Sequence, residues 1–172
     1  ISNLSSVDFD NLEFGKVFTD YMMVSDYNGE EWSDFDIQPL QSLSMHPATS
    51  VLHYGQAIFE GLKACRDKND EVVLFRPAYN WERFCQSAKR MCMPEIPENI
   101  FLEGLKKLIK LDNAWVPPNE GTSLYIRPFM FATDAFIGVK PSDTYKFMIF
   151  TCPVGKYYSE PVKVKIEEEF VR

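Results

Sequence analysis

The chain has 172 residues, 45% of them hydrophobic and 15% aromatic, which is enough to bury one well-packed core of mixed helices and strands. Its formal net charge of −7, with no block of basic residues, argues against nucleic acid as a partner. No apolar stretch approaches the length of a membrane span, so we expect no membrane partner. Four cysteines without a CxxC pair and two histidines argue against a metal site and favour a reducing compartment.

The first part of the chain predicts a hairpin and an edge strand. Residues 17–24 are β-branched and aromatic, and Asn28-Gly29 supplies a turn because both residues tolerate positive φ. Residues 35–43, interrupted by Pro39, are typical of a broken edge strand. A turn or short helical passage follows at residues 45–51.

Residues 53–64 are the most informative stretch, because aromatic, ionisable and glycine residues stand together where a buried strand would alternate. We interpret the stretch as one strand, joined by a charged turn at residues 67–70 to a second strand at 71–75. Tyr54 and Phe59 are candidates to flank a substrate, and Glu60-Gly61 permits a close backbone approach. The alternative is ordinary core packing, the commoner role of aromatic residues on a strand.

Two amphipathic helices are predicted next. Asn80 is a good N-cap for the first, which runs until Pro94 and repeats apolar residues at helical spacing: Phe84, Ala88, Met91 and Cys92. The second begins after Pro97 and carries Phe101, Leu105, Leu108 and Ile109 on one face, with Lys106, Lys107 and Lys110 away from it. Both helices should pack on a core.

Strands return in the last third. Residues 122–131 and 145–152 are predicted strands joined by a loop at 134–143, and residues 162–170 form a further predicted strand. Strands outnumber helices, and their order favours an α+β fold with a mostly antiparallel or mixed sheet and two packing helices.

Tyr125 and Arg127 stand two residues apart on a predicted strand, so their side chains share one face, opposite Leu124 and Ile126. A phenol beside a guanidinium presents hydrogen-bond donors to an anion such as a carboxylate. The alternative is an exposed polar face on a half-buried sheet.

Arg83 lies three residues after Asn80, which would place it in the first helical turn, where the helix dipole disfavours a cation. Phosphate binding would account for it. A surface salt bridge to Glu82 or Asp70 is the alternative.

The order of several short segments resembles the branched-chain aminotransferases, which are pyridoxal-phosphate enzymes of fold type IV. The segments are Phe14-Gly15-Lys16-Val17-Phe18-Thr19-Asp20, His53 to Ala64, Leu74-Phe75-Arg76-Pro77 with Asn80 and Arg83, Ser123-Leu124-Tyr125-Ile126-Arg127-Pro128, Cys152-Pro153-Val154-Gly155, and Phe170-Val171-Arg172. The match runs in register from about Phe14 to Arg172. It favours the branched-chain type over a D-amino acid aminotransferase or an aminodeoxychorismate lyase of the same fold.

The resemblance implies a role for individual residues. Arg83 matches the arginine that holds the phosphate of pyridoxal 5'-phosphate, and Arg127 matches an arginine near the substrate carboxylate. The pocket for the branched side chain is implied at Phe14, Tyr54, Phe59, Tyr125 and Tyr157. Ile137, Gly138 and Val139 match a loop that reaches into the other subunit's pocket, so a homodimer is implied, with isoleucine at position 137 where leucine is usual.

The resemblance also implies what to expect of the whole protein. It would transfer amino groups reversibly between leucine, isoleucine or valine and 2-oxoglutarate, in the cytoplasm, with the mitochondrial matrix left open. Residues 1–13 would be an extension and residues 14–172 the small domain, with the Schiff-base lysine in a large domain beyond Arg172. No catalytic residue is therefore expected in this chain. The alternative from another class is a binding or oligomerisation module without catalysis.

Overall fold

The computed structural model describes residues 2, 4–156 and 160–169. A seven-stranded sheet forms the centre, made of β1 (Tyr21–Tyr27), β2 (Asp36–Pro39), β3 (Ala57–Phe59), β4 (Leu62–Arg66), β5 (Val72–Leu74), β6 (Ser123–Ala132) and β7 (Tyr145–Val154). The strand order is β2-β1-β7-β6-β4-β5, and β3 also pairs with β6. Every strand pair among the described residues is antiparallel. The predicted α+β class is confirmed.

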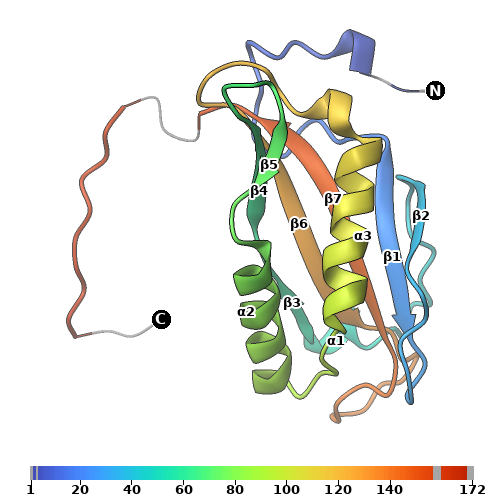
Figure 1. The fold of residues 1–172 in the computed structure, drawn as a ribbon. Coiled ribbons are helices and arrows are strands. Elements are labelled where there is room, and N and C mark those ends of the chain that lie inside the picture. Colours follow the sequence, from blue (N-terminus) through green and yellow to red (C-terminus); the bar gives the residue numbers. More distant parts are fainter. Residues whose placement is uncertain (1, 3, 157–159, 170–172) are drawn as a thin grey trace.

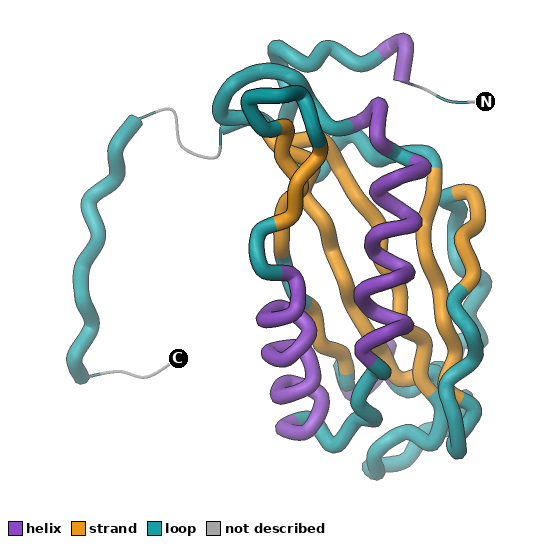
Figure 2. Tube along the Cα trace, viewed as in Figure 1, coloured by secondary structure: helices purple, strands orange, loops and turns teal. Residues whose placement is uncertain are grey.

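Two long helices, α2 (Pro77–Arg90) and α3 (Glu98–Leu111), cover one face of the sheet (Figures 1 and 2). The layers meet at three buried rings: Phe84 of α2, Phe101 of α3 and Phe147 of β7, whose centroids lie 5.4–5.8 Å apart. Rings at this spacing add to the stability that their buried area already supplies. This layer is the main core of the molecule.

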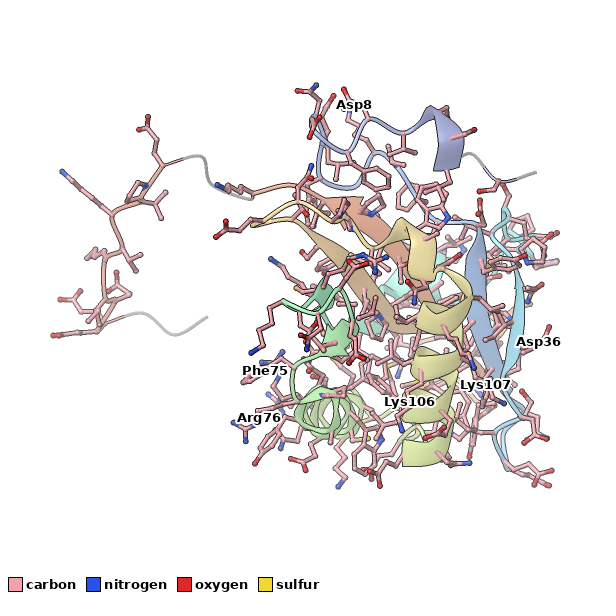
Figure 3. The ribbon with its side chains drawn as sticks, turned by 45° about the horizontal axis from the view of Figure 1, so that its top comes forward. Asp8, Asp36, Phe75, Arg76, Lys106 and Lys107 are labelled. Atoms are coloured by element: carbon pink, nitrogen blue, oxygen red, sulfur yellow. The ribbon has the colours of Figure 1, made fainter. Side chains whose placement is uncertain are left out.

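Helix α3 agrees with its prediction. Its four predicted core residues are buried, while Lys106 and Lys107 project from the outer side (Figure 3). The hairpin turn is also confirmed, since Gly29 has φ 104° and the Asn28 side chain accepts the backbone N–H groups of Glu30 and Glu31 at 2.9 Å. Asn28 and Gly29 predicted this turn correctly because the turn needs a side-chain acceptor, which asparagine supplies, and a positive φ, which glycine adopts.

Helix α2 begins earlier than predicted. Its first residue is Pro77, and Arg76 before it has φ 48°, so Asn80 lies inside the helix and is not its N-cap. Proline at the first helical position has its φ already set for a helix, which explains the earlier start. Phe75 and Arg76 lie at this entrance (Figure 3). The helix also ends at Arg90, leaving Met91 and Cys92 exposed instead of in the predicted core.

The predicted strand over residues 53–64 is wrong in its first part. Residues Val51–Tyr54 form a short helix, α1, which ends at Gly55 because that glycine adopts the left-handed conformation with φ 67°. The rest of the stretch is interrupted at Glu60-Gly61, so β3 pairs with residues 129–131 of β6 and β4 with residues 124–126. The two short strands together form the partner of β6 on that side.

The strand predicted at residues 162–170 is also wrong over its described part. Residues 160–169 are exposed and form no strand. Strand propensity alone is insufficient here, because a strand is stable only when a neighbour satisfies its backbone hydrogen bonds.

Two short 3-10 helices, η1 (Leu4–Ser6) and η2 (Asn113–Trp115), complete the fold. No helix among the described residues is long and apolar enough to cross a membrane.

The sheet face away from α2 and α3 carries a second apolar cluster. Met22 and Val24 of β1, Phe131 of β6 and Met148 of β7 form its buried centre. Phe129 and Phe150 extend it with rings 5.7 Å apart. Phe18 continues the row of rings and is 41% exposed. This face is therefore apolar and only partly covered, and it bears part of the candidate site.

Candidate active site

Tyr125 and Arg127 share one face of β6, as predicted, and this face points away from the two long helices, while Leu124 and Ile126 are fully buried in the main core. The Arg127 guanidinium donates two hydrogen bonds to the Tyr125 hydroxyl oxygen, from Nε at 3.1 Å and from Nη2 at 2.9 Å. The Tyr125 oxygen is therefore an acceptor from arginine, and its own proton is free to be donated elsewhere. Together the two side chains form a rigid donor pair.

Two further predicted residues lie against this pair. The Phe59 ring lies 4.4 Å from the Arg127 guanidinium carbon, a cation–π distance. The Phe14 ring meets Tyr125 edge-on at 5.2 Å. Phe14 is 50% exposed and Phe59 is 65% exposed, so both present apolar surface beside the donors. The structure thus brings four of the predicted site residues together.

Gly61 makes room for the Tyr125 phenol. A Cβ at position 61 would lie 2.7 Å from the Tyr125 hydroxyl oxygen, closer than real Cβ contacts. The φ of Gly61 is not positive, so the need for glycine is the close approach and not the backbone conformation. Gly61 thus permits a close approach of the Tyr125 side chain, whereas the predicted close backbone approach to a substrate stays a prediction.

Arg83 is not in the first turn of its helix, because α2 begins six residues before it at Pro77. The argument from an unfavourable helix dipole therefore does not apply. Its ion-pair partner is neither Glu82 nor Asp70 but Glu60, whose carboxylate accepts Nε at 2.9 Å and Nη2 at 2.5 Å. Hydrogen bonding to Glu60 raises the pKa of Arg83 above its ordinary value. The Arg83 side chain is 65% exposed and the Glu60 side chain 8%.

Arg83 retains donors for an anion. A guanidinium has five N–H groups in a fixed plane, and the Glu60 contacts use two of them. The remaining three belong to Nη1 and Nη2 on an exposed side chain, which suits an oxyanion such as a phosphate. A groove beside Arg83 is lined by Phe59 and Glu60 and, along α2, by Gln86, Ser87 and Arg90. The residues present therefore fit a phosphate-bearing ligand.

The two arginines contact neighbouring residues where β3 ends. Arg127 contacts the ring of Phe59, and Arg83 pairs with the next residue, Glu60. Because successive side chains on a strand point to opposite faces, the two cations flank the chain on its two sides at the end of β3.

The remaining predicted site residues lie elsewhere. Tyr54 is on α1, 43% exposed, with its ring 6.2 Å from that of His53. Ile137, Gly138 and Val139 lie in the loop joining β6 to β7, at the opposite end of β6 from Tyr125 (Figure 1). Ile137 is 67% exposed and Val139 is 94% exposed. Tyr157 lies outside the described residues.

Glu60 is the residue that the sequence reasoning missed as a site component. The sequence did indicate this role: Ile58, Glu60 and Leu62 occupy alternate positions from β3 to β4, and all three are buried. A glutamate at a core-facing position requires a partner, because carboxylates are almost never fully buried alone.

Among the described residues no group of His, Cys, Asp and Glu side chains could hold a metal ion.

Known proteins share both the sequence and the fold of this chain, although no family model matches it. The curated branched-chain-amino-acid aminotransferase 2 of Bacillus subtilis (strain 168) is 54% identical over 169 residues, which cover 96% of this chain and 47% of that protein. The chain thus spans about half the length of the curated relatives it matches.

Solved structures give the same result. The Escherichia coli branched-chain amino acid aminotransferase matches with a TM-score of 0.58 at 26% identity, covering 78% of this chain and 41% of that one. The T.th. branched-chain amino acid aminotransferase, solved with pyridoxamine 5'-phosphate, shares the fold with a TM-score of 0.61 at 23% identity, covering 81% of this chain and 41% of its own. Over the residues that it shares with these relatives, the chain is similar in sequence to the branched-chain aminotransferases, and its α+β fold matches the small domain of their solved structures.

Proposed function

We propose that the protein is a pyridoxal-phosphate-dependent aminotransferase that moves amino groups reversibly between leucine, isoleucine or valine and 2-oxoglutarate. Sequence similarity to the curated branched-chain aminotransferases supports the reaction, and the solved T.th. relative with pyridoxamine 5'-phosphate supports the cofactor. In this proposal residues 14–172 form the small domain after an extension at 1–13, and the lysine that carries the cofactor belongs to a large domain beyond them. The bacterial relatives support a cytoplasmic protein.

The observation that carries the proposal is the pair of arginines flanking residues 59 and 60. Arg83 would hold the cofactor phosphate with the donors that Glu60 leaves free. The bound cofactor supplies the electron sink for chemistry at the substrate's α carbon. Arg127 and the Tyr125 hydroxyl would donate to a substrate carboxylate, which fixes the orientation of the amino acid.

Aromatic side chains would form the rest of the pocket. Phe14 and Phe59 present apolar surface directly beside the donor pair, which excludes water and suits a branched hydrocarbon side chain. We assign Tyr54 and Tyr157 to the same pocket in the complete protein. Ile137, Gly138 and Val139 would complete the pocket of a second subunit in a homodimer. The high exposure of Ile137 and Val139 at a loop tip supports that assignment.

The reaction is tested by assaying the full-length protein with 2-oxoglutarate as acceptor. We expect turnover with leucine, isoleucine and valine and little with D-alanine. Preference for D-alanine would favour a D-amino acid aminotransferase, and release of pyruvate from aminodeoxychorismate would favour a lyase of the same fold. Complete absence of turnover in protein saturated with pyridoxal phosphate would favour a non-catalytic module.

Gly61→Ala should lower kcat/KM for leucine about tenfold, which corresponds to about 1.4 kcal/mol of transition-state stabilisation. The added Cβ would lie 2.7 Å from the Tyr125 hydroxyl oxygen, so the phenol must move and its hydrogen bonds with Arg127 must lengthen. Gly104→Ala on α3 is the matched control, since its Cβ would meet the flexible end of Met23 away from the site. Unchanged kinetics in Gly61→Ala would refute the role of this close approach.

A further inference from the structure

Glu60 is a buried carboxylate in an apolar strand environment. Ile58 and Leu62 on either side of it face the same core, and the Glu60 side chain is only 8% exposed. Its oxygens are nevertheless fully engaged: Oε2 accepts Nε of Arg83, and Oε1 accepts both Nη2 of Arg83 and the backbone N–H of Gly61 at 2.7 Å. A buried carboxylate with this set of partners is a fixed point in the fold.

The ion pair is strongly asymmetric. The carboxylate is buried while the Arg83 side chain is 65% exposed, so Glu60 is the anchored end and the guanidinium is the end that reaches solvent. An exposed arginine without an anchor samples many rotamers, and binding must then restrict them. Here two parallel hydrogen bonds fix the guanidinium plane before a ligand arrives.

Glu60 is also tied to the second arginine. Its backbone N–H donates to the Pro128 carbonyl at 2.8 Å, which holds the link between β3 and β4 against β6. The residue before it, Phe59, supports the Arg127 guanidinium with its ring. Glu60 therefore contacts Arg83 directly and is the neighbour of the residue that contacts Arg127.

We propose that Glu60 is a positioning residue that orients Arg83 toward the phosphate monoester of the cofactor. This inference rests on the proposed function, in which Arg83 binds that phosphate. Glu60 has two opposing effects: it pre-orients the guanidinium, and its negative charge weakens the attraction of Arg83 for a phosphate dianion. High salt weakens the part of the charge effect that acts through solvent, with a screening length of about 3 Å at about 1 M salt, whereas it leaves the orientation effect unchanged.

The test is a double-mutant cycle on the full-length protein, read out as the dissociation constant for pyridoxal phosphate. The four proteins are the wild type, Glu60→Gln, Arg83→Ala and the double variant, each titrated at about 0.1 M and about 1 M salt. At the higher salt we expect Glu60→Gln to raise the dissociation constant about tenfold. In the Arg83→Ala background, Glu60→Gln should leave the dissociation constant unchanged. If Glu60 only stabilised the fold, its substitution would raise the dissociation constant in both backgrounds.

Two results would overturn the positioning role while leaving the proposed function in place. One is an unchanged or lower dissociation constant for Glu60→Gln at about 1 M salt, and the other is an effect that adds in full to that of Arg83→Ala. A wild type without affinity for pyridoxal phosphate, or an Arg83→Ala variant with normal affinity, would overturn the assignment of Arg83 and this inference with it.

Glu82→Gln is the matched control, since it removes one negative charge next to Arg83 from an exposed position on the same helix. Its dissociation constant should match the wild type at about 1 M salt. If Glu60→Gln lowers the melting temperature of the cofactor-free protein, Arg83→Lys provides the test, because it keeps the buried carboxylate and the cation but loses the two-bond fork. A wild-type dissociation constant in Arg83→Lys at about 1 M salt would overturn the proposal.

Discussion

Arg127→Lys in the full-length protein is expected to lower kcat/KM for leucine about 10- to 100-fold. Lysine keeps the positive charge but cannot donate two bonds to the Tyr125 oxygen while offering further donors to a carboxylate. It also loses the contact between the guanidinium and the Phe59 ring. The loss should appear in kcat/KM for both leucine and 2-oxoglutarate, since each carries a carboxylate to be oriented, and steady-state kinetics with each substrate varied in turn would measure it.

Lys106→Met serves as the control for that experiment, because it removes one cation from the outer side of α3, where Lys106 pairs with Glu103. Its kinetics should match the wild type. Arg127→Lys with wild-type kcat/KM would show that the fork of hydrogen bonds at Tyr125 does not orient the substrate.

Asp112→Asn is expected to remove a pH dependence of stability worth about 3 kcal/mol. Asp112 directly follows α3 as its C-cap and is 1% exposed. Neither of its carboxylate oxygens has a hydrogen-bond partner of good geometry, although Thr19 and the backbone of Tyr21 lie close. Burial raises the pKa of its carboxyl from 3.8 to about 6. The position also disfavours negative charge, since the C-terminal end of a helix dipole is itself negative.

The direction of this effect follows from proton binding. A folded-state pKa above the unfolded one means that the folded chain holds the proton more tightly. The stability contributed by Asp112 is therefore fully present below pH 3.8 and is lost as the pH rises through about 6. This is opposite to the usual carboxylate, whose pKa is lowered by folding.

Unfolding of wild type and Asp112→Asn between about pH 4 and pH 8 would measure the effect. The difference in unfolding free energy between the two proteins isolates this carboxyl from all others, and we expect it to move by about 3 kcal/mol in favour of the variant as the pH rises. A difference that stays constant across this range would show that Asp112 does not titrate with a raised pKa.

Much of the fold could be predicted because patterns within short segments of the sequence indicate the helices and turns. Helix α3 has apolar residues at helical spacing after a proline, and the Asn28-Gly29 turn has the chemistry that its backbone requires. The start of α2 was misplaced because Asn80 is a good N-cap by type, whereas the structure uses Pro77 after a left-handed Arg76. Two start signals competed, and local sequence does not decide between them.

The sequence predicted individual residues of the candidate site but not the contacts between residues from different elements. Tyr125 and Arg127 share a face because strand geometry requires it, and this needed no tertiary information. The pairing of Arg83 with Glu60 joins residues 23 positions apart, and the break between β3 and β4 that places Glu60 there depends on how both strands pair with β6. Such contacts follow from sheet register, which the periodicity of one segment does not specify.

A crystal structure of the full-length protein with pyridoxal phosphate bound tests the central claim most directly. We predict phosphate oxygens within about 3 Å of Nη1 or Nη2 of Arg83, with Nε of Arg83 still donating to Glu60. Tyr125 and Arg127 should face the substrate side of the same cavity. A phosphate bound away from Arg83, or an Arg83 turned away from Glu60 to reach it, would contradict this account.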